Sequence, residues 1–525
     1  MREQYREEPR MKERGEAAIF TLMMLMMSAV LVFTAVEGAR IAASAFYLQM
    51  AADAAAESAF GEYCLPLWEQ YRLLFFYEEA PLSGTVEDLA GVYADAGSWG
   101  AGISFLGFSN TEATADAVYL TDNGAQAFYD EAAEHARIHL PLEMLEELSA
   151  QADLMEDVEE ITDLMGDLGD FSSGVIGEIE ERTMQAADSG DEGDAGHLTG
   201  ISSGLASQSG ELLGRLDEIA GEYGLRPVSA DAVELTEANA GSDTRSFPVN
   251  TLAGLAGDAY LNFFTGGADV SDAVIDSSAV ISDELQDVDD GSQGASQPAS
   301  SPGGRVSEWF LFREYLLDQL SGWSSVRGDH ALAYEWEYLL GGKSSDRENL
   351  IYTVNRLLVF RCAVSFLEIM ADEGRRAEAM SIALAICGVT GIPEAVRLVE
   401  AAIIAVWAVN DGADDVKQLL AGQKVPLLEL AGYEMPLLEM DYRGYIRLLL
   451  YTRGKKLRGR ALDVIQASMR QTCPSFDVRR CIYSADIVIT AGSGALFTSV
   501  TDIAGSGSFG GRALSARTFY TYEAA

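Results

Sequence analysis

Lysine and cysteine are scarce in this chain of 525 residues, which contains six lysines and five cysteines. Basic residues number 36 in all, against 82 acidic ones, so the net charge at pH 7 is −46. Because phosphate binding requires a basic excess, the charge argues against nucleic acid as a partner. Five cysteines spread over such a length do not form a disulfide scaffold. With 48% hydrophobic residues, we expect a solvated, acidic body with at least one full core.

Two pairs of cysteines differ in their surroundings. Cys473 and Cys481 bracket a short polar run, and they are the pair that the sequence offers as a possible disulfide. Cys362 and Cys387 occur in apolar, helical sequence, where a cysteine is usually a small core residue.

Motifs for nucleotide binding and nucleophilic catalysis are missing. Neither a Walker loop nor a Gly-x-Ser-x-Gly elbow occurs in the sequence. The run Gly505–Gly510 satisfies Gly-x-Gly-x-x-Gly, but it lies 15 residues from the C-terminus, which leaves no room for a βαβ unit that would hold a dinucleotide. A hairpin loop is the better interpretation. We therefore predict no cofactor, no catalytic residue and no enzymatic activity.

Candidate metal ligands fail on their spacing. His135 and His139 are four residues apart on a predicted helix, but Glu134 precedes both, whereas a zincin places its glutamate between the histidines. Asp287 and its acidic neighbours suggest a calcium loop, but with Asp287 as its first residue Gly291 is the fifth, whereas an EF-hand loop has glycine at position six. His197 and His330 are isolated in the sequence. We predict no specific metal site, with weak divalent-cation binding by acidic sequence as the alternative.

An apolar run near the N-terminus predicts a membrane anchor. Residues Ala17–Val36 contain no charge, and 20 helical residues at 1.5 Å each match the ~30 Å hydrocarbon core of a bilayer. Five Lys and Arg residues precede the run, so residues 1–16 are expected on the cytoplasmic side and the body outside. The alternative is a secretory signal cleaved near Ala43–Ala45. We predict a single-pass protein of the cell membrane with a transmembrane helix at 17–36.

The anchor helix is expected to continue beyond the membrane. No proline occurs between Pro9 and Pro66, and the intervening sequence is rich in strong helix formers. Small residues recur at helical spacing between Ile41 and Ala56, which predicts one face suited to close packing. A continuous helix from about Gly15 to Phe60 follows.

This N-terminal region resembles that of TadE/TadG-like proteins of the Tad (Flp) pilus systems. The matching sequence is Arg14-Gly15, the apolar run, the step Glu37-Gly38-Ala39-Arg40 and the Ala-rich stretch Ala51–Ala56. The resemblance implies pilin-like or pilus-assembly proteins as partners, and a possible processing site between Gly15 and Glu16. Prepilin processing is associated with an acidic residue five places after the glycine, where this chain has Phe20.

Other segments are similar to an uncharacterised family of membrane-anchored Gram-positive envelope proteins. The resemblance is carried by residues 61–76, 333–350, 414–428, 442–450 and 460–466. It implies a place in an envelope machine and supplies no reaction.

The body divides by composition into three parts. Residues 37–150 are expected to hold the helical extension and the first part of an α+β body. Residues 151–304 contain 32 acidic residues against four arginines, with a Gly/Ser-rich linker at 291–304, and are predicted to be an acidic insertion. Residues 305–525 read as helices followed by C-terminal strands, one of them at 494–500. A buried helical hairpin is expected around Pro393, which fits the first turn of its helix. Earlier in the chain, Thr121–Gly124 reads as a turn and a helix is expected after Pro141. The predicted fold is α+β and predominantly helical, with a mixed sheet that joins both ends of the chain.

Basic residues cluster once in the body, at Arg453, Lys455, Lys456, Arg458 and Arg460. The cluster could bind an anionic partner, and the alternative is the solvated start of a helix. Three charged residues lie in apolar helical sequence, namely Arg361, Glu335 and Asp463, and we expect internal ion pairs there because buried charges need partners.

Two functions fit these features. The first is a membrane-anchored, extracytoplasmic structural or assembly component of a Tad/Flp-like pilus or secretion apparatus. The second is a stand-alone cell-surface binding or adhesion protein. In both, one helix contacts membrane lipid.

Overall fold

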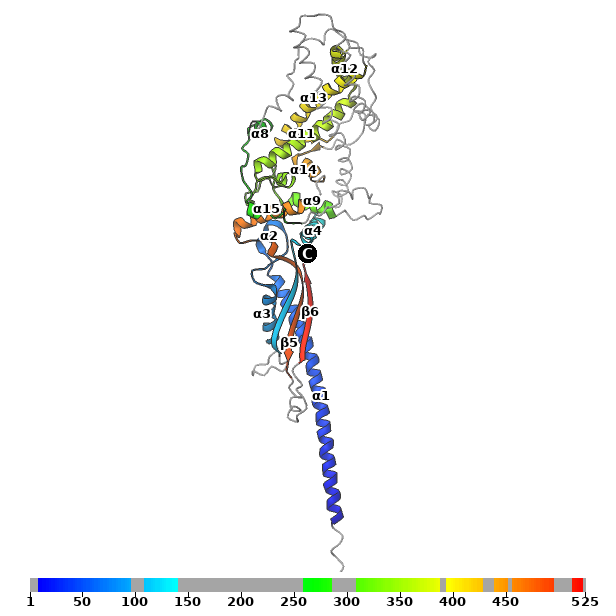
Figure 1. Ribbon diagram of the computed structural model, residues 1–525, viewed down its shortest axis with the longest axis vertical. Helices are drawn as coiled ribbons and strands as arrows, with labels where there is room; N and C mark the ends of the chain where they lie inside the picture. The colour runs from blue at the N-terminus through cyan, green and yellow to red at the C-terminus, as the bar shows by residue number, and fades with distance from the viewer. Residues whose placement is uncertain are drawn as a thin grey trace, which may run out of the picture. The chain divides into compact units, whose positions relative to one another are not determined.

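The computed structural model describes residues 8–95, 108–139, 258–285, 308–387, 393–427, 439–451, 456–494 and 512–522. The chain forms two compact units (Figure 1). The first consists of Met1–Glu131 and Asp477–Ala525, and the second is Ala132–Phe476. Both termini therefore belong to the first unit, and the second is inserted into it in sequence. This division differs from the three parts that composition suggests.

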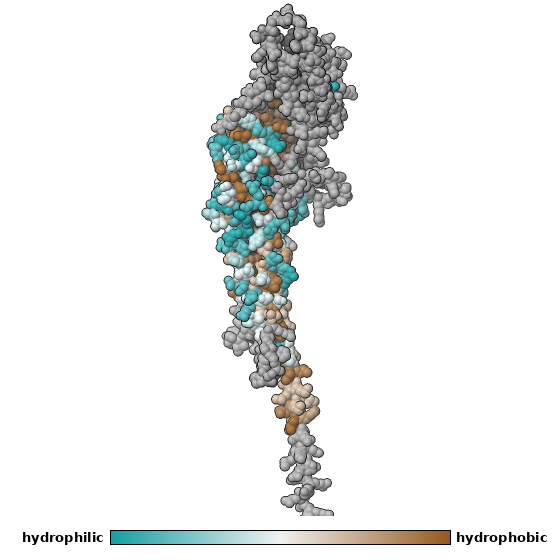
Figure 2. All heavy atoms as spheres, viewed as in Figure 1, coloured by the Kyte–Doolittle hydropathy of each residue, from teal (hydrophilic) through white to brown (hydrophobic). Residues whose placement is uncertain are grey.

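The first unit is organised around one long helix, α1 (Glu8–Gly61) (Figure 1). The predicted continuous helix is confirmed, including the passage without a break from the apolar run into the Ala-rich stretch. The apolar run is exposed along its length, and apolar side chains cover the part of α1 that extends beyond the sheet (Figure 2). From Glu37 onward one face of the helix becomes buried.

A four-stranded sheet packs against the second half of α1. Its strands are β1 (Phe76–Tyr77), β2 (Phe108–Tyr119), β5 (Cys481–Ser493) and β6 (Arg512–Thr521). Every pairing is antiparallel, with β5 in the centre, β2 on one edge and β6 and β1 on the other. The sheet joins both ends of the chain as predicted, but the prediction of a mixed sheet was wrong. Two further helices, α2 (Leu65–Tyr71) and α3 (Leu82–Asp95), complete the unit.

Small residues set the packing of helix on sheet. Ala52, Ala55 and Ala56 of α1 are fully buried in one core cluster with Ile487 and Ile489 of β5. Alternation along β5 and β6 directs every second side chain toward this core. Alanines on the helix let its backbone approach the sheet closely, as the small-residue face predicted.

The second unit is helical. Its helices are α8 (Asp258–Thr265), α9 (Glu308–Gln319), α10 (Glu335–Gly341), α11 (Asp346–Ala371), α12 (Glu373–Cys387), α13 (Pro393–Leu420), α14 (Tyr442–Tyr451) and α15 (Leu457–Thr472), with a short hairpin of β3 (Val425–Pro426) and β4 (Glu439–Met440). α12 and α13 pack as the predicted helical hairpin, and Pro393 is the first residue of α13 as predicted. The fold as a whole is α+β and predominantly helical, as predicted.

One turn and one helix lead from the first unit to the second. Asn123, Gly124 and Ala125 have positive φ angles, which places the predicted Thr121–Gly124 turn at the start of α4 (Asp122–His139). The boundary between the two units falls within α4.

Within the described residues, two helices are long and apolar enough to cross a membrane. One is the segment Ala17–Gly61 of α1, and the other is α11. Two thirds of the apolar window of α11 is buried within its own unit, which is typical of a core helix, whereas that of α1 is not buried at all. The N-terminal helix is thus the candidate anchor.

Several sequence predictions fall outside the described residues. They are the helix after Pro141, the strand at 494–500, the loop Gly505–Gly510, His197 and the acidic run at 287–290. Of the acidic insertion at 151–304, the structure describes 258–285, which holds α8 and a 3₁₀ turn, η3 (Ser277–Ala279).

Candidate functional site

The most unusual polar contact of the first unit lies one residue beyond the apolar run. Arg40 Nη2 is 2.6 Å from Glu37 Oε1, and the same nitrogen donates a hydrogen bond to the carbonyl oxygen of Gly494, at the end of β5. Glu37 is 4% exposed and Arg40 2%. The Glu-x-x-Arg step, which carries part of the sequence resemblance, therefore forms a buried contact that joins α1 to the sheet.

The opposite face of α1 is exposed and uncharged over the same stretch. Gly38 has open space where a Cβ would lie, and Ala42 is exposed four residues later. Phe46 and Met50 follow on this face and are 64% and 51% exposed. The first exposed charge after the apolar run is that of Asp53. For 16 residues beyond Val36, α1 thus presents solvent with a surface of small and apolar residues.

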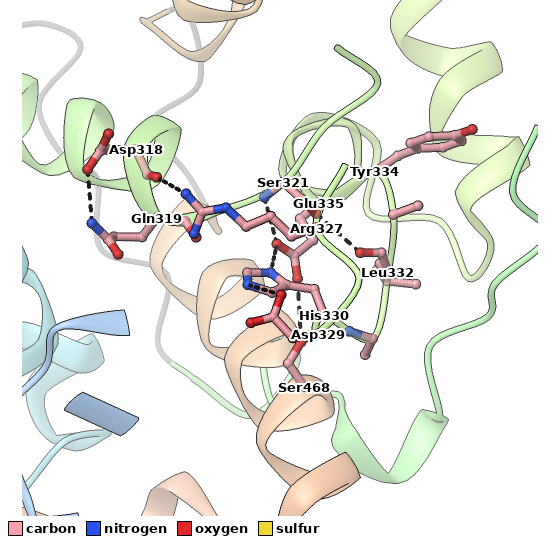
Figure 3. Close-up of polar contacts among 12 residues, drawn as sticks. Asp318, Gln319, Ser321, Arg327, Asp329, His330, Leu332, Tyr334, Glu335 and Ser468 are labelled. Carbon is pink, nitrogen blue, oxygen red and sulfur yellow. Dashed lines mark hydrogen bonds and ion pairs between the residues drawn. The ribbon is translucent and has the colours of Figure 1, made fainter. Parts of the chain in front are cut away.

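The second unit contains a buried histidine–carboxylate pair (Figure 3). His330 Nδ1 lies 2.6 Å from Glu335 Oε2, and the exposed fractions of the two side chains are 1% and 0%. The backbone N–H of Ser321 donates to the same carboxylate oxygen at 2.8 Å, and the Ser468 hydroxyl approaches the other at 3.4 Å. Burial raises the pKa of Glu335, partly opposed by His330. The pair holds the segment between α9 and α10 against α15.

Glu337, two residues further on, is also fully buried. Tyr442 donates its hydroxyl hydrogen to Glu337 Oε1 at 2.6 Å, and the backbone N–H of Trp323 donates to the same oxygen at 3.0 Å. Oε2 has no hydrogen-bond partner within the described residues. Burial raises the pKa of Glu337 to about 7, against the hydrogen bonds from Tyr442 and Trp323, which lower it. A carboxyl group in this position is half protonated near neutral pH.

Two further carboxylates anchor loops to helices. Asp346 accepts hydrogen bonds from the backbone N–H groups of Ala333 and Tyr334 and from the Ser271 hydroxyl. Asp463 of α15 accepts from the N–H groups of Ile281 and Ser282 and from the Tyr338 hydroxyl. Burial raises the pKa of both carboxyl groups.

These carboxylates share one chemical character. Each is buried, and its oxygens face backbone N–H groups, hydroxyl groups or a ring nitrogen of the same unit, all of which stabilise a fixed loop. Across the ranges that the structure describes, no group of three or more His, Cys, Asp and Glu side chains is placed to hold a metal. The arrangement is suited to fixing the helical unit rigidly.

The three charged residues predicted to form ion pairs differ in outcome. Arg361 does so, with its Nη2 2.6 Å from Asp415, and its guanidinium also donates to the carbonyl oxygens of Pro426 and Leu427. Glu335 pairs with His330, which the sequence presented as isolated. Asp463 departs from the prediction, because the two backbone N–H groups and the Tyr338 hydroxyl that donate to it carry no charge.

Two of the five residues of the predicted basic cluster, Arg458 and Arg460, are turned inward. Arg460 donates to the carbonyl oxygens of Leu339 and Leu340, at the C-terminal end of α10, and Arg458 is 8% exposed. Lys456 stays partly exposed and pairs with Asp283 at 3.5 Å. Arg453 and Lys455 lie outside the described residues. A helix C-terminus attracts positive charge, which gives Arg460 an internal role. Binding of an anionic partner by the cluster stays a prediction.

His135 and His139 stack on one face of α4. Their ring centroids are 4.2 Å apart, and His135 also meets Tyr315 edge to face. His139 is exposed, as predicted for a helix face.

The possible disulfide would join a residue of the second unit to one of the first, and it stays a prediction. Cys473, at the end of α15, and Cys481, at the start of β5, are both free thiols. Cys481 is fully buried in the first unit, and burial raises the pKa of its thiol well above the ordinary value. Its place at the start of the central strand accounts for that burial.

The possible processing site, Gly15–Glu16, lies within α1.

Several of these contacts had no signal in the sequence. His330 lies in a non-helical segment, five residues before Glu335 at the start of α10, and Glu337 meets Tyr442 across 105 residues. The hydrogen bond of Arg40 to Gly494 joins residues that are 454 positions apart. Among these residues, only Glu335 was expected from its apolar neighbourhood to be paired internally.

Fold and site together define a chain with one projecting apolar helix, long enough to span a membrane, and a body of two units. A model of a family of unknown function, DUF5702, matches residues 241–432 and 439–493. The match covers most of the helical unit and ends on the last residue of β5. It agrees with the predicted similarity to an uncharacterised family. No curated protein and no solved structure matches the chain. The N-terminal resemblance to TadE/TadG-like proteins receives no support from these comparisons and stays a prediction.

Proposed function

We propose that this chain is a membrane-anchored, extracytoplasmic structural or assembly component of a Tad/Flp-like pilus or related secretion apparatus. The observation that carries the proposal is the division of α1 into two parts. Its first part is apolar and exposed on all sides, and its second part is built into the core of the first unit. Such a helix ties a folded body rigidly to an anchor.

Lipid is the partner that the first part of α1 requires. Burying one Val, Leu, Ile, Phe or Met side chain gains roughly 1.5–3 kcal/mol, and more than ten such side chains between Ile19 and Val36 are exposed. Water is therefore a poor solvent for this segment, whereas a bilayer of matching thickness suits it. The Lys and Arg residues before Ala17 favour a cytoplasmic N-terminus.

The uncharged face of α1 supports lateral packing with a partner helix. Between Val36 and Asp53 this face exposes no charge, although 22% of the residues of the chain are charged. Gly38, Ala39 and Ala42 permit the close approach of another helix, and Phe46 and Met50 add apolar area above them. The acidic body repels other acidic bodies, so contact along this helix is the favoured route of assembly.

The inserted helical unit fits a structural role. Its carboxylates stabilise loops from within, and its paired arginines do the same. A rigid unit carried on an anchored stalk is suited to presenting a fixed surface outside the cell.

Site-specific photo-crosslinking in native membranes tests the proposal. A photoreactive amino acid at Phe46 is expected to capture other membrane-anchored, pilin-like subunits. The matched control is Thr114, which is exposed on the outer face of β2, where few adducts are expected. Equal capture at both positions, or capture of no protein at Phe46, would contradict lateral assembly through α1.

A further inference from the structure

Two hydrogen bonds fix how β6 runs beside α1. Gln49 Nε2 donates to the carbonyl oxygen of Arg517 at 3.1 Å, and the Tyr522 hydroxyl donates to the carbonyl oxygen of Phe60 at 2.5 Å. The eleven helical residues between Gln49 and Phe60 rise about 16 Å, and the five strand residues between Arg517 and Tyr522 rise about the same. Helix and strand therefore advance together, in the same direction.

The same register, extended toward the N-terminus, shows which residue of α1 lies beside the start of β6. Arg512 lies five residues before Arg517, about 16 Å along the strand, which corresponds to about eleven residues of helix and hence to Gly38. The contact of Arg40 with Gly494 gives the same level independently, because Gly494 follows Ser493, the partner of Arg512. This end of the sheet lies beside the helix where the apolar run stops.

Bilayer dimensions convert this position of the sheet end along α1 into a depth in the membrane. Gly38 and Arg40 follow Val36 by two and four residues, about 3–6 Å along the helix. The polar headgroup layer on each side of the hydrocarbon core is roughly 5–8 Å thick. With Ala17–Val36 in the core, the sheet end falls within the headgroup layer.

The residues at this end suit that environment. The strand ends 108–111, 491–494 and 512–513 contain one charged residue, Arg512, and no carboxylate. The opposite end of the sheet carries Glu78 and Glu79 after β1, and Asp122 after β2. Acidic residues are abundant elsewhere in the chain, whereas this end of the sheet lacks the negative charge that an anionic surface would repel.

We propose that the end of the sheet formed by Phe108–Ser109, Ser493–Gly494 and Arg512–Ala513 rests in the lipid headgroup layer, so that the first unit sits on the membrane surface. This rests on the proposed function in one respect, namely that α1 spans a membrane. The contact makes the bilayer a second support for the first unit and limits rocking of the body about its anchor.

Depth-dependent fluorescence quenching tests this contact in the full-length protein. The chain is reconstituted in nanodiscs of phosphatidylcholine and phosphatidylglycerol, with an environment-sensitive fluorescent amino acid at one position. The test position is Ala513, at the sheet end, and the control is Ala80, which follows β1 at the opposite end; both are exposed. A third probe at Met27 reports the anchor itself. Lipids brominated high on the acyl chain, or near its end, serve as quenchers.

We expect lipid brominated high on the chain to quench the Ala513 probe at least about twofold more than the Ala80 probe, because only Ala513 reaches the headgroup layer. Lipid brominated near the chain end should quench the Met27 probe most. Quenching at Met27 with equal, weak quenching at Ala513 and Ala80 overturns the surface contact and leaves the anchor standing. No quenching at Met27 overturns the anchor, and with it the proposed function.

Discussion

Arg40 and Glu37 form a buried ion pair one turn apart on α1, and the same guanidinium bonds the carbonyl oxygen of Gly494. The pair lies where the helix stops being apolar on all sides and begins to pack on the sheet. It joins the anchor to the central strand of the first unit, so motion of the helix is passed directly to the sheet.

Replacing Arg40 by Met is expected to destabilise the first unit by about 3–5 kcal/mol, because Glu37 is left as a buried charge without its partner. Hydrogen exchange of the β5 amides measures this unit separately. The double change Glu37→Gln and Arg40→Met should recover part of the loss.

The control for this experiment is Arg517→Met, on the exposed face of the same sheet, where Arg517 pairs with Asp486. Water surrounds that pair, so its loss should leave β5 exchange unchanged. Equal effects of the two substitutions would show that burial of the Arg40 pair has no energetic consequence.

Glu337 makes the stability of the helical unit depend on pH. Its folded-state pKa of about 7 exceeds the ordinary value of 4.5, so the folded state holds the proton more tightly than the unfolded state. The resulting stabilisation is complete below pH 4.5 and is lost as the pH rises through 7, by roughly 3 kcal/mol at most. Glu337→Gln should remove this part of the decline in urea unfolding between pH 5 and pH 8. Glu378→Gln, at an exposed position of α12, should leave the decline intact; a Glu337→Gln variant with the wild-type profile would refute the assignment.

The His330–Glu335 pair is expected to act as a coupled unit. In a double-mutant cycle of His330→Leu and Glu335→Gln, the unfolding free energies should show a coupling of about 1–3 kcal/mol, because the two side chains share one buried hydrogen bond. His139→Leu, at an exposed position, should change stability by less than about 0.5 kcal/mol. Additive effects of the two buried substitutions would mean that each is held by its other neighbours.

Gly322 and Gly328 lie in the same segment and differ in the space around them. A Cβ at Gly322 would lie 2.1 Å from Cε3 of Trp336, which is fully buried, whereas nothing lies within 4 Å of a Cβ at Gly328. Gly322→Ala should therefore cost about 1–3 kcal/mol of unfolding free energy through overpacking. Gly328→Ala should cost little or nothing. A comparison of thermal unfolding midpoints decides it, and equal midpoints would contradict the packing of Trp336 on Gly322.

Local sequence patterns predicted the helices and turns well, but they could not predict which strands pair with one another. The uncharged run Ala17–Val36, the position of Pro393 and the turn at Thr121–Gly124 each depend on neighbouring residues, so the sequence displays them. The pairing of β2 with β5 joins residues more than 360 positions apart, and the alternation of side chains shows the two faces of a strand but not its partner. For the same reason the sheet was expected to be mixed.

The candidate sites divide in the same way. Apolar surroundings indicated that Arg361 and Glu335 are buried and paired, but the partners Asp415 and His330 depend on tertiary packing. Within the basic cluster, sequence likewise does not show that Arg460 reaches back to α10.

The central claim is that α1 anchors an extracytoplasmic body, and controlled proteolysis of intact cells tests it most directly. A cleavage sequence for a site-specific protease is inserted within residues 291–304, and in a second variant the same sequence precedes Arg2. Protease added outside should cut the first variant in intact cells and the second only after the membrane is opened. Protection of the first variant, or cutting of the second, in intact cells would contradict the account.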